Sequence, residues 1–81
     1  MIDTRSAPRF RVTKPARIED AGFAVSCIIR DLSVTGANVE VAELDTRVIP
    51  ATFDLIVPED GLALGCRIVW RKPFRIGVEF V

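Results

Sequence analysis

Six short runs in which apolar and polar residues alternate limit the class of fold that this chain can adopt. A period of two places successive side chains on opposite faces, which is typical of a β-strand with one buried face. No window shows the longer period of an amphipathic helix. The residues expected on the buried faces are, in chain order, Phe10, Val12, Ala16 and Ile18; Phe23, Val25, Cys27 and Ile29; Ala37, Val39 and Val41; Phe53, Leu55 and Val57; Leu62, Leu64, Cys66, Ile68 and Trp70; and Ile76, Val78 and Phe80.

Turn and loop residues separate these runs. Residues 19–22, 58–61 and 72–73 carry the Gly, Pro and Asp chemistry of turns, and the polar segments 31–36 and 43–47 are predicted loops. Strands spaced by about ten residues favour an all-β barrel or sandwich. Because six strands in 81 residues leave exposed edges unless the sheet closes, we predict a β-barrel.

Five residues within the runs carry further expectations. Lys14 interrupts the apolar face of the first run, and Pro15 marks a sheet edge or a bulge. Trp70 is in phase with its apolar neighbours, so we expect it to pack in the core rather than to stack on a base. Cys27 and Cys66 also fall on inward faces. We expect both to be buried free thiols, because disulfides are rare in the cytosol.

The composition excludes several classes of function. The chain has no His, which removes the usual general base and the commonest metal ligand. Two Cys cannot complete a four-ligand zinc site, and no nucleophile–base pair is visible, so we expect no catalytic residue, no metal, no cofactor and no enzymatic activity. No apolar run reaches membrane-spanning length and no signal-peptide core is present, so we expect no membrane contact and a cytoplasmic location.

The net charge is zero, but the charges are unevenly distributed. Residues 1–17 hold five basic groups against one acid, and residues 67–75 hold four basic groups and no acid. The segment 18–66 holds nine acids and two basic groups. If the two basic segments meet in the fold, they form a local anion-attracting surface, whereas if they stay apart they are ordinary solvated charges.

The N-terminal segment 1–8 has no apolar period and contains Pro8, so we predict a flexible basic arm followed by a single domain over residues 9–81. Arg5 and Arg9 stand four positions apart at this end of the chain. The alternative is a basic tail that only aids solubility.

The loop 31–36 concentrates three useful groups. Asp31 offers a carboxylate, Ser33 a hydroxyl, and Gly36 a backbone free to adopt positive φ. A short polar loop on a rigid β-scaffold is where binding groups are commonly found. The alternative is a local turn, in which Asp31 and Ser33 bond their own backbone and Gly36 supplies the positive φ.

The motif residues are Arg5 and Arg9, followed by Asp31, Ser33 and Gly36. Together they resemble the PilZ domain family, whose members are bacterial receptors for the second messenger cyclic di-GMP. Segments 11–18 and 77–80 resemble the family's first and last strands, so the likeness covers nearly the whole chain. The resemblance implies a six-stranded antiparallel β-barrel. Thr4 stands where the family often has a further Arg, and the chain stops at Val81 without an evident C-terminal helix.

The resemblance also assigns roles in binding cyclic di-GMP, a dianion with two guanine bases. Arg5 and Arg9 would bind phosphate or guanine, because the guanidinium fork donates paired hydrogen bonds and its plane stacks on bases. Asp31 would accept from the N1–H and exocyclic amine of guanine, with a further contact from Ser33. Gly36 would let the backbone approach the ligand closely.

We therefore expect a non-enzymatic cyclic di-GMP sensor whose arm becomes ordered over the barrel when ligand binds, and which signals through a downstream protein partner. One alternative is a degenerate family member that binds no nucleotide and acts through protein contacts. Another is a small β-barrel that binds single-stranded nucleic acid, which normally needs exposed aromatic platforms. The sequence argues against nucleic acid, because the apolar phase includes Phe10, Phe23, Phe53, Trp70 and Phe80.

Overall fold

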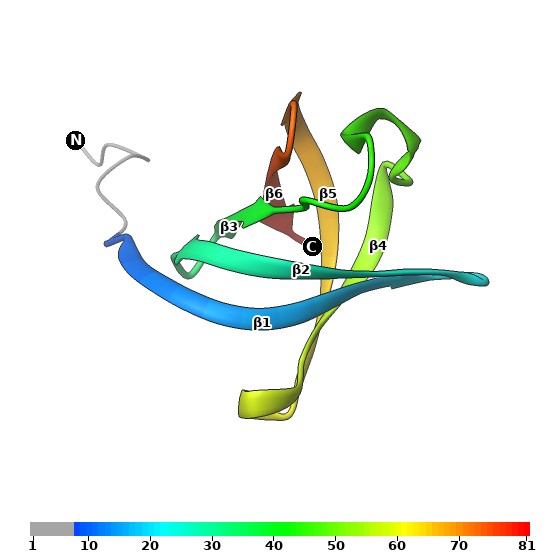
Figure 1. Ribbon diagram of the computed structural model, residues 1–81. Coiled ribbons are helices and arrows are strands. Elements are labelled where there is room, and N and C mark those ends of the chain that lie inside the picture. The colour runs from blue at the N-terminus through cyan, green and yellow to red at the C-terminus, as the bar shows by residue number, and fades with distance from the viewer. Residues whose placement is uncertain (1–7) are drawn as a thin grey trace.

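The computed structural model describes residues 8–81, in which six strands close into an antiparallel barrel (Figure 1). The predicted arm therefore lies outside the described residues, apart from Pro8. The strands are β1 (Phe10–Asp20), β2 (Phe23–Leu32), β3 (Gly36–Glu40), β4 (Thr52–Val57), β5 (Leu62–Lys72) and β6 (Arg75–Phe80). Their order around the barrel is β1-β2-β3-β6-β5-β4, with β4 returning to β1. The prediction of a six-stranded antiparallel β-barrel is confirmed.

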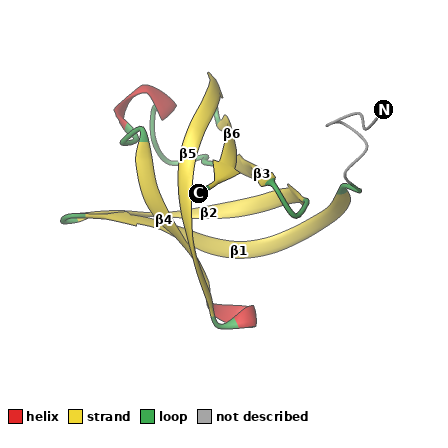
Figure 2. Cartoon of the chain, turned by 180° about the vertical axis from the view of Figure 1, so that it is seen from behind, coloured by secondary structure: helices red, strands yellow, loops and turns green. Residues whose placement is uncertain are grey.

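Two short 3₁₀ turns lie at opposite ends of the barrel (Figure 2). The turn η2 (Thr46–Val48) joins β3 to β4, and η3 (Pro58–Asp60) joins β4 to β5. Arg71 of β5 donates to the carbonyl oxygens of Thr46 and Ile49 at 2.6 and 2.7 Å. These bonds attach the long β3–β4 connection to the β5–β6 hairpin. No α-helix occurs within residues 8–81.

The core lies inside the barrel and consists of inward positions of the six strands together with Val41 and Ile49 of the β3–β4 connection. Fifteen hydrophobic residues are buried there: Ala16, Ile18, Val25, Cys27, Ile29, Ala37, Val39, Val41, Ile49, Phe53, Leu55, Val57, Cys66, Ile76 and Val78. For all of these residues except Ile49, burial was predicted from the alternation of apolar and polar residues. Burial of these side chains is the main stabilising contribution, at about 25 cal/mol for each Å² of apolar surface removed from water.

Both cysteines are buried and free, as expected. Burial raises the pKa of the Cys27 thiol to about 12 and that of Cys66 to about 11. Desolvation disfavours the thiolate, so both groups stay protonated and behave as small hydrophobic side chains.

Three register shifts interrupt the strand pairing. They lie between Arg11 and Lys14 of β1, between Ile29 and Asp31 of β2, and between Ile68 and Trp70 of β5. In each case one strand carries one residue more than its partner, which reverses the alternation of faces beyond that point.

The third shift makes one prediction wrong. Trp70 pairs with Gly77 after the extra residue Val69, so its side chain moves to the outer face, where it is 38% exposed. A regular strand would have kept Trp70 in phase with Ile68, which packs against the core.

The expectation for Phe10 is also wrong, because its side chain is 64% exposed. The strand β1 pairs with β4 only through Arg17, Ile18 and Glu19. The start of β1 therefore extends beyond its pairing with β4 (Figure 1), and Phe10 has no paired β4 residue.

Candidate functional site

The two sequence motifs meet where β1 begins and β2 ends. Arg9 directly precedes β1, and its Nη1 lies 3.0 Å from Oδ1 of Asp31. The register explains this contact, since Arg11 lies opposite Asp31 in the β1–β2 pairing. Asp31 belongs to strand β2 rather than to the predicted loop, which is shortened to residues 33–35. The Asp31 carboxylate therefore projects from a hydrogen-bonded strand, which positions it more rigidly than a loop would.

The Arg9–Asp31 pair remains accessible to solvent. The side chain of Arg9 is 69% exposed and that of Asp31 is 23% exposed. Exposed ion pairs of this kind contribute only about 0–1 kcal/mol. A ligand that offers better partners to both groups can therefore displace the contact at little cost.

Ser33 organises the short β2–β3 connection. Its Oγ accepts hydrogen bonds from the backbone N–H groups of Thr35 and Gly36, both at 3.2 Å, and its own N–H donates to the Gly36 carbonyl at 2.9 Å. The hydroxyl therefore has the local turn role that was one of the two alternatives for this residue. A ligand contact from Ser33 requires the hydroxyl to share these bonds.

The explanation for Gly36 changes with the structure. Within the described residues only Gly22 and Gly61 among the glycines have positive φ, so neither the turn nor the strand needs left-handed backbone at Gly36. A Cβ atom at Gly36 would instead collide with the carbonyl oxygen of Val78 on β6. Glycine is needed here because β3 and β6 approach closely, and the positive φ that the local-turn alternative assigned to Gly36 does not occur.

A row of residues crosses four strands on the outer face beside Asp31. Asp31 of β2 pairs with Asn38 of β3, Asn38 pairs with Gly77 of β6, and Gly77 pairs with Trp70 of β5. The Trp70 indole covers Gly77, where a Cβ atom would collide with the ring. Lys72 Nζ lies 5.3 Å from the ring centroid, within the range of a cation–π contact.

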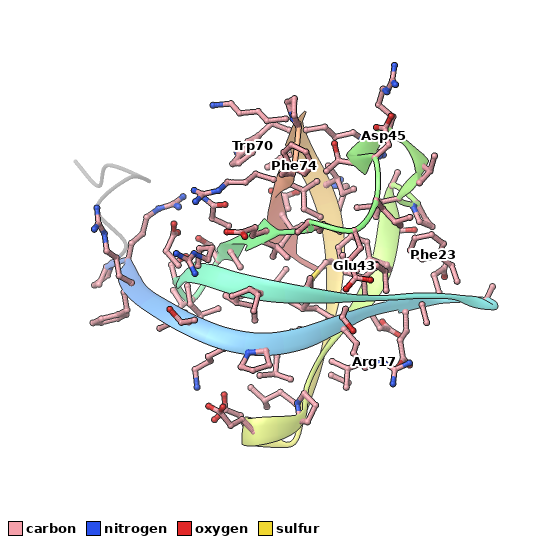
Figure 3. The ribbon with its side chains drawn as sticks, viewed as in Figure 1. Arg17, Phe23, Glu43, Asp45, Trp70 and Phe74 are labelled. Atoms are coloured by element: carbon pink, nitrogen blue, oxygen red, sulfur yellow. The ribbon has the colours of Figure 1, made fainter. Side chains whose placement is uncertain are left out.

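Two side chains of this row differ from an ordinary barrel surface. Figure 3 shows Trp70 on the outside of the barrel near Phe74, at the β5–β6 end. The Oδ1 atom of Asn38 is buried and has no hydrogen-bond partner within residues 8–81. Leaving such an acceptor unpaired costs about 1–3 kcal/mol. Trp70 could not be identified as a surface residue from the sequence, because the bulge at Val69 leaves no clear signal in the alternating pattern.

A polar hollow of about 500 Å³ adjoins Asp31. Its lining includes Arg11 from the N-terminal basic segment and Arg75 from the C-terminal one, together with Arg30. Residues of the two basic segments therefore meet here, which is the first of the two alternatives left open by the charge distribution. Arg5, the remaining predicted site residue, lies outside the described residues.

Other classes of site find little support in the described part of the chain. Residues 8–81 contain no cluster of three or more His, Cys, Asp or Glu able to hold a metal ion. Nor do they include a helix with the length and apolar character needed to cross a bilayer. The expectation that few aromatic side chains are free is wrong, since Phe10, Trp70 and Phe74 are all exposed.

Comparison with known proteins agrees with the fold and the motifs. No curated protein matches the chain. The family model of the PilZ domain matches residues 3–81, which is essentially the whole chain. PilZ domains are binding domains and, as a family, receptors for cyclic di-GMP. With this match over a closed six-stranded barrel, the chain belongs to the PilZ domain family.

Proposed function

We propose that this protein binds cyclic di-GMP at Asp31 and Arg9. The observation that carries the proposal is the 3.0 Å contact between these two groups in a chain of the PilZ family. Residues that lie 22 positions apart in sequence are brought side by side by the β1–β2 register. The family's ligand needs both a carboxylate and a guanidinium at one place.

The carboxylate of Asp31 is suited to the Watson–Crick edge of guanine. An ionised carboxylate only accepts hydrogen bonds, and the guanine N1–H and exocyclic amine both donate. Adenine presents an acceptor at N1 and would face the carboxylate with repulsion. We therefore propose that Asp31 provides the selection for guanine.

The guanidinium of Arg9 is suited to the phosphate or to the base. It carries five N–H donors, and only Nη1 contacts Asp31 in the ligand-free protein. The remaining donors can bind a phosphate in the paired geometry that makes Arg–phosphate contacts strong. We propose that Arg5 joins Arg9 in this role, and that Ser33 and Gly36 hold the shape of the turn beside Asp31.

Ligand binding is proposed to order residues 1–8 against the barrel, since both motif arginines belong to this end of the chain. The changed surface then binds a downstream protein, and no reaction is catalysed. A receptor for a second messenger acts in the cytoplasm, which is the location we propose. Each of these steps depends on binding itself, which is tested first.

Isothermal titration calorimetry with cyclic di-GMP tests the binding step. The wild-type protein should release heat at micromolar ligand, and Arg9→Ala and Asp31→Ala should each weaken binding at least tenfold. Arg17→Ala is the matched control, because Arg17 is an exposed β1 residue paired with Glu19 rather than with the site. Cyclic di-AMP should bind far more weakly than cyclic di-GMP. Folded wild-type protein that shows no binding at tens of micromolar ligand would reject the proposal.

A second candidate function is supported by the exposed aromatic side chains. Phe10, Phe74 and Trp70 are accessible beside basic residues, which is the combination that single-stranded nucleic acid requires. A gel-shift assay with mixed-sequence oligonucleotides separates the two functions. Binding of oligonucleotides without binding of cyclic di-GMP would favour this candidate, and binding of neither would favour a module for protein contacts alone.

A further inference from the structure

The hollow beside Asp31 has a strongly cationic lining that the motif residues do not explain. Its volume is about 500 Å³, in the range of ordinary small-ligand sites. It is lined by Arg11, Val12 and Thr13 of β1, Arg30 and Asp31 of β2, and Arg75 of β6. Three of these six residues are arginines from three different strands.

Two of the barrel's bulges bring these side chains together. Arg30 is the extra residue of β2 in the shift between Ile29 and Asp31. The shift between Arg11 and Lys14 lies in β1 directly opposite, and Val12 and Thr13 fall within it. Bulges redirect side chains and are concentrated at functional positions.

Within residues 8–81, the three arginines have no anionic partner closer than 3.6 Å. Glu40 is shared between Arg30 and Arg75 at 3.6 and 4.0 Å, which are long contacts. The carboxylate of Asp31 is engaged by Arg9, and Arg11 makes no ion pair within residues 8–81. By contrast, Arg47 is satisfied by Asp45, with the closest contact at 2.6 Å. The hollow therefore carries excess positive charge that is not neutralised by the described protein.

An anion with several acceptor oxygens fits this lining. Guanidinium groups converging from three strands can each donate to a phosphate oxygen, and the Thr13 hydroxyl offers one more donor. Asp31 lines both this hollow and the proposed guanine site. A guanine held at Asp31 therefore brings the phosphodiester groups of the same ligand within reach of the hollow.

We infer that Arg11, Arg30 and Arg75 form a phosphodiester subsite for cyclic di-GMP, separate from the motif arginines Arg5 and Arg9. The inference rests on the proposed function. The bound group is either the second phosphodiester of the ligand at Asp31 or a phosphodiester of a second ligand molecule stacked on the first. The chemistry of recognition is the same in both cases, and the stoichiometry distinguishes them.

Calorimetry with cyclic di-GMP on Arg30→Gln, Arg75→Gln and Arg11→Gln tests the subsite. Loss of a hydrogen bond to a charged group weakens binding by about ten- to hundredfold, so each variant should lose affinity in this range. Arg75→Lys keeps the positive charge but not the paired N–H donors of the guanidinium group, so this variant should lose less affinity than Arg75→Gln. The matched control is Arg17→Gln, an exposed arginine toward the other end of β1 that does not line the hollow (Figure 3). Thermal unfolding checks that every variant is folded.

The outcomes separate the subsite from the proposed function. Reduced affinity at unchanged stoichiometry assigns the hollow to the second phosphodiester of one ligand. A fall from two bound ligands to one assigns it to a second molecule, and both results support the subsite. If Arg9→Ala abolishes binding while all three Gln variants match Arg17→Gln, the subsite is refuted and the proposed function stands. A folded wild-type protein that does not bind refutes both.

Discussion

Replacing Gly36 with Ala should separate two explanations for a glycine at the start of β3. One explanation is that the backbone must approach the ligand closely, as the family resemblance implied. The structure supports another, because a Cβ atom at this position collides with the backbone carbonyl oxygen of Val78. That oxygen cannot rotate away as a side chain can, so β3 and β6 must move apart.

The cost of that movement can be bounded. Overpacking a tightly packed site destabilises a protein by about 1–3 kcal/mol, and here the obstacle is backbone, which favours the upper half of that range. For a small domain, each kcal/mol lowers Tm by about 4–8 °C. We therefore expect Gly36→Ala to lower Tm by about 8–24 °C, for a loss of about 2–3 kcal/mol.

Differential scanning fluorimetry or calorimetry measures this shift, and Gly65→Ala is the matched control. A Cβ atom at Gly65 would lie 3.2 Å from the Cγ2 atom of Val81, a side chain that can rotate. This variant should lose little stability. If Gly36→Ala is as stable as wild type but no longer binds cyclic di-GMP, the steric reasoning is refuted and the glycine serves the ligand directly.

Three further results are expected. Trp70 is the chain's single tryptophan, so cyclic di-GMP should quench or shift the intrinsic fluorescence if a base stacks on it; an unchanged spectrum at saturating ligand would place the base elsewhere. Cys27 and Cys66 should react with a thiol reagent at pH 8 only after denaturation, since burial raises both thiol pKa values to about 12 and about 11; fast labelling of native protein would contradict the closed core. Hydrogen bonds from Arg47 lower the pKa of Asp45 to about 2, below the ordinary 3.8, so this group stabilises the fold above that ordinary value and the effect is lost as the pH falls toward 2. The Tm difference between wild type and Asp45→Asn should therefore shrink over that window, and a constant difference would count against the pairing.

The regular parts of the barrel could be predicted because they depend on local pattern. In β4, for example, Phe53, Leu55 and Val57 alternate with polar or half-buried neighbours, and all three are buried in the core. Alternation of apolar and polar residues indicates a strand wherever it occurs, and turn residues mark where the strand begins and ends. Closure of the sheet into a barrel could be predicted from the number of strands, since an open sheet of this size would leave unpaired edges.

The roles of the site residues depend on distant contacts and could be predicted only in part. The juxtaposition of Asp31 with Arg9 was implied by the family motifs, whereas the reason for Gly36 depends on how closely β6 approaches. Nothing in residues 31–36 indicates that approach. The sequence likewise could not decide whether the Ser33 hydroxyl accepts hydrogen bonds within the turn or contacts a ligand, because a serine serves either role.

The three bulges lie at the candidate site or on the row that leads from Asp31 to Trp70, whereas Leu62, also expected in the core, is exposed at the start of β5 away from this row. The register shifts within residues 8–81 fall on β1, beside Asp31, and on β2 and β5, which the row crosses. An extra residue reverses the alternation of faces, so the strand beyond a bulge turns outward side chains that a regular strand would turn inward. One bulge turns Trp70 outward and two others direct Arg30 and Thr13 toward the hollow. The alternation that identifies the strands is therefore interrupted on the same strands that carry Asp31, Arg30 and Trp70. Functional positions are among the places where local pattern and fold disagree.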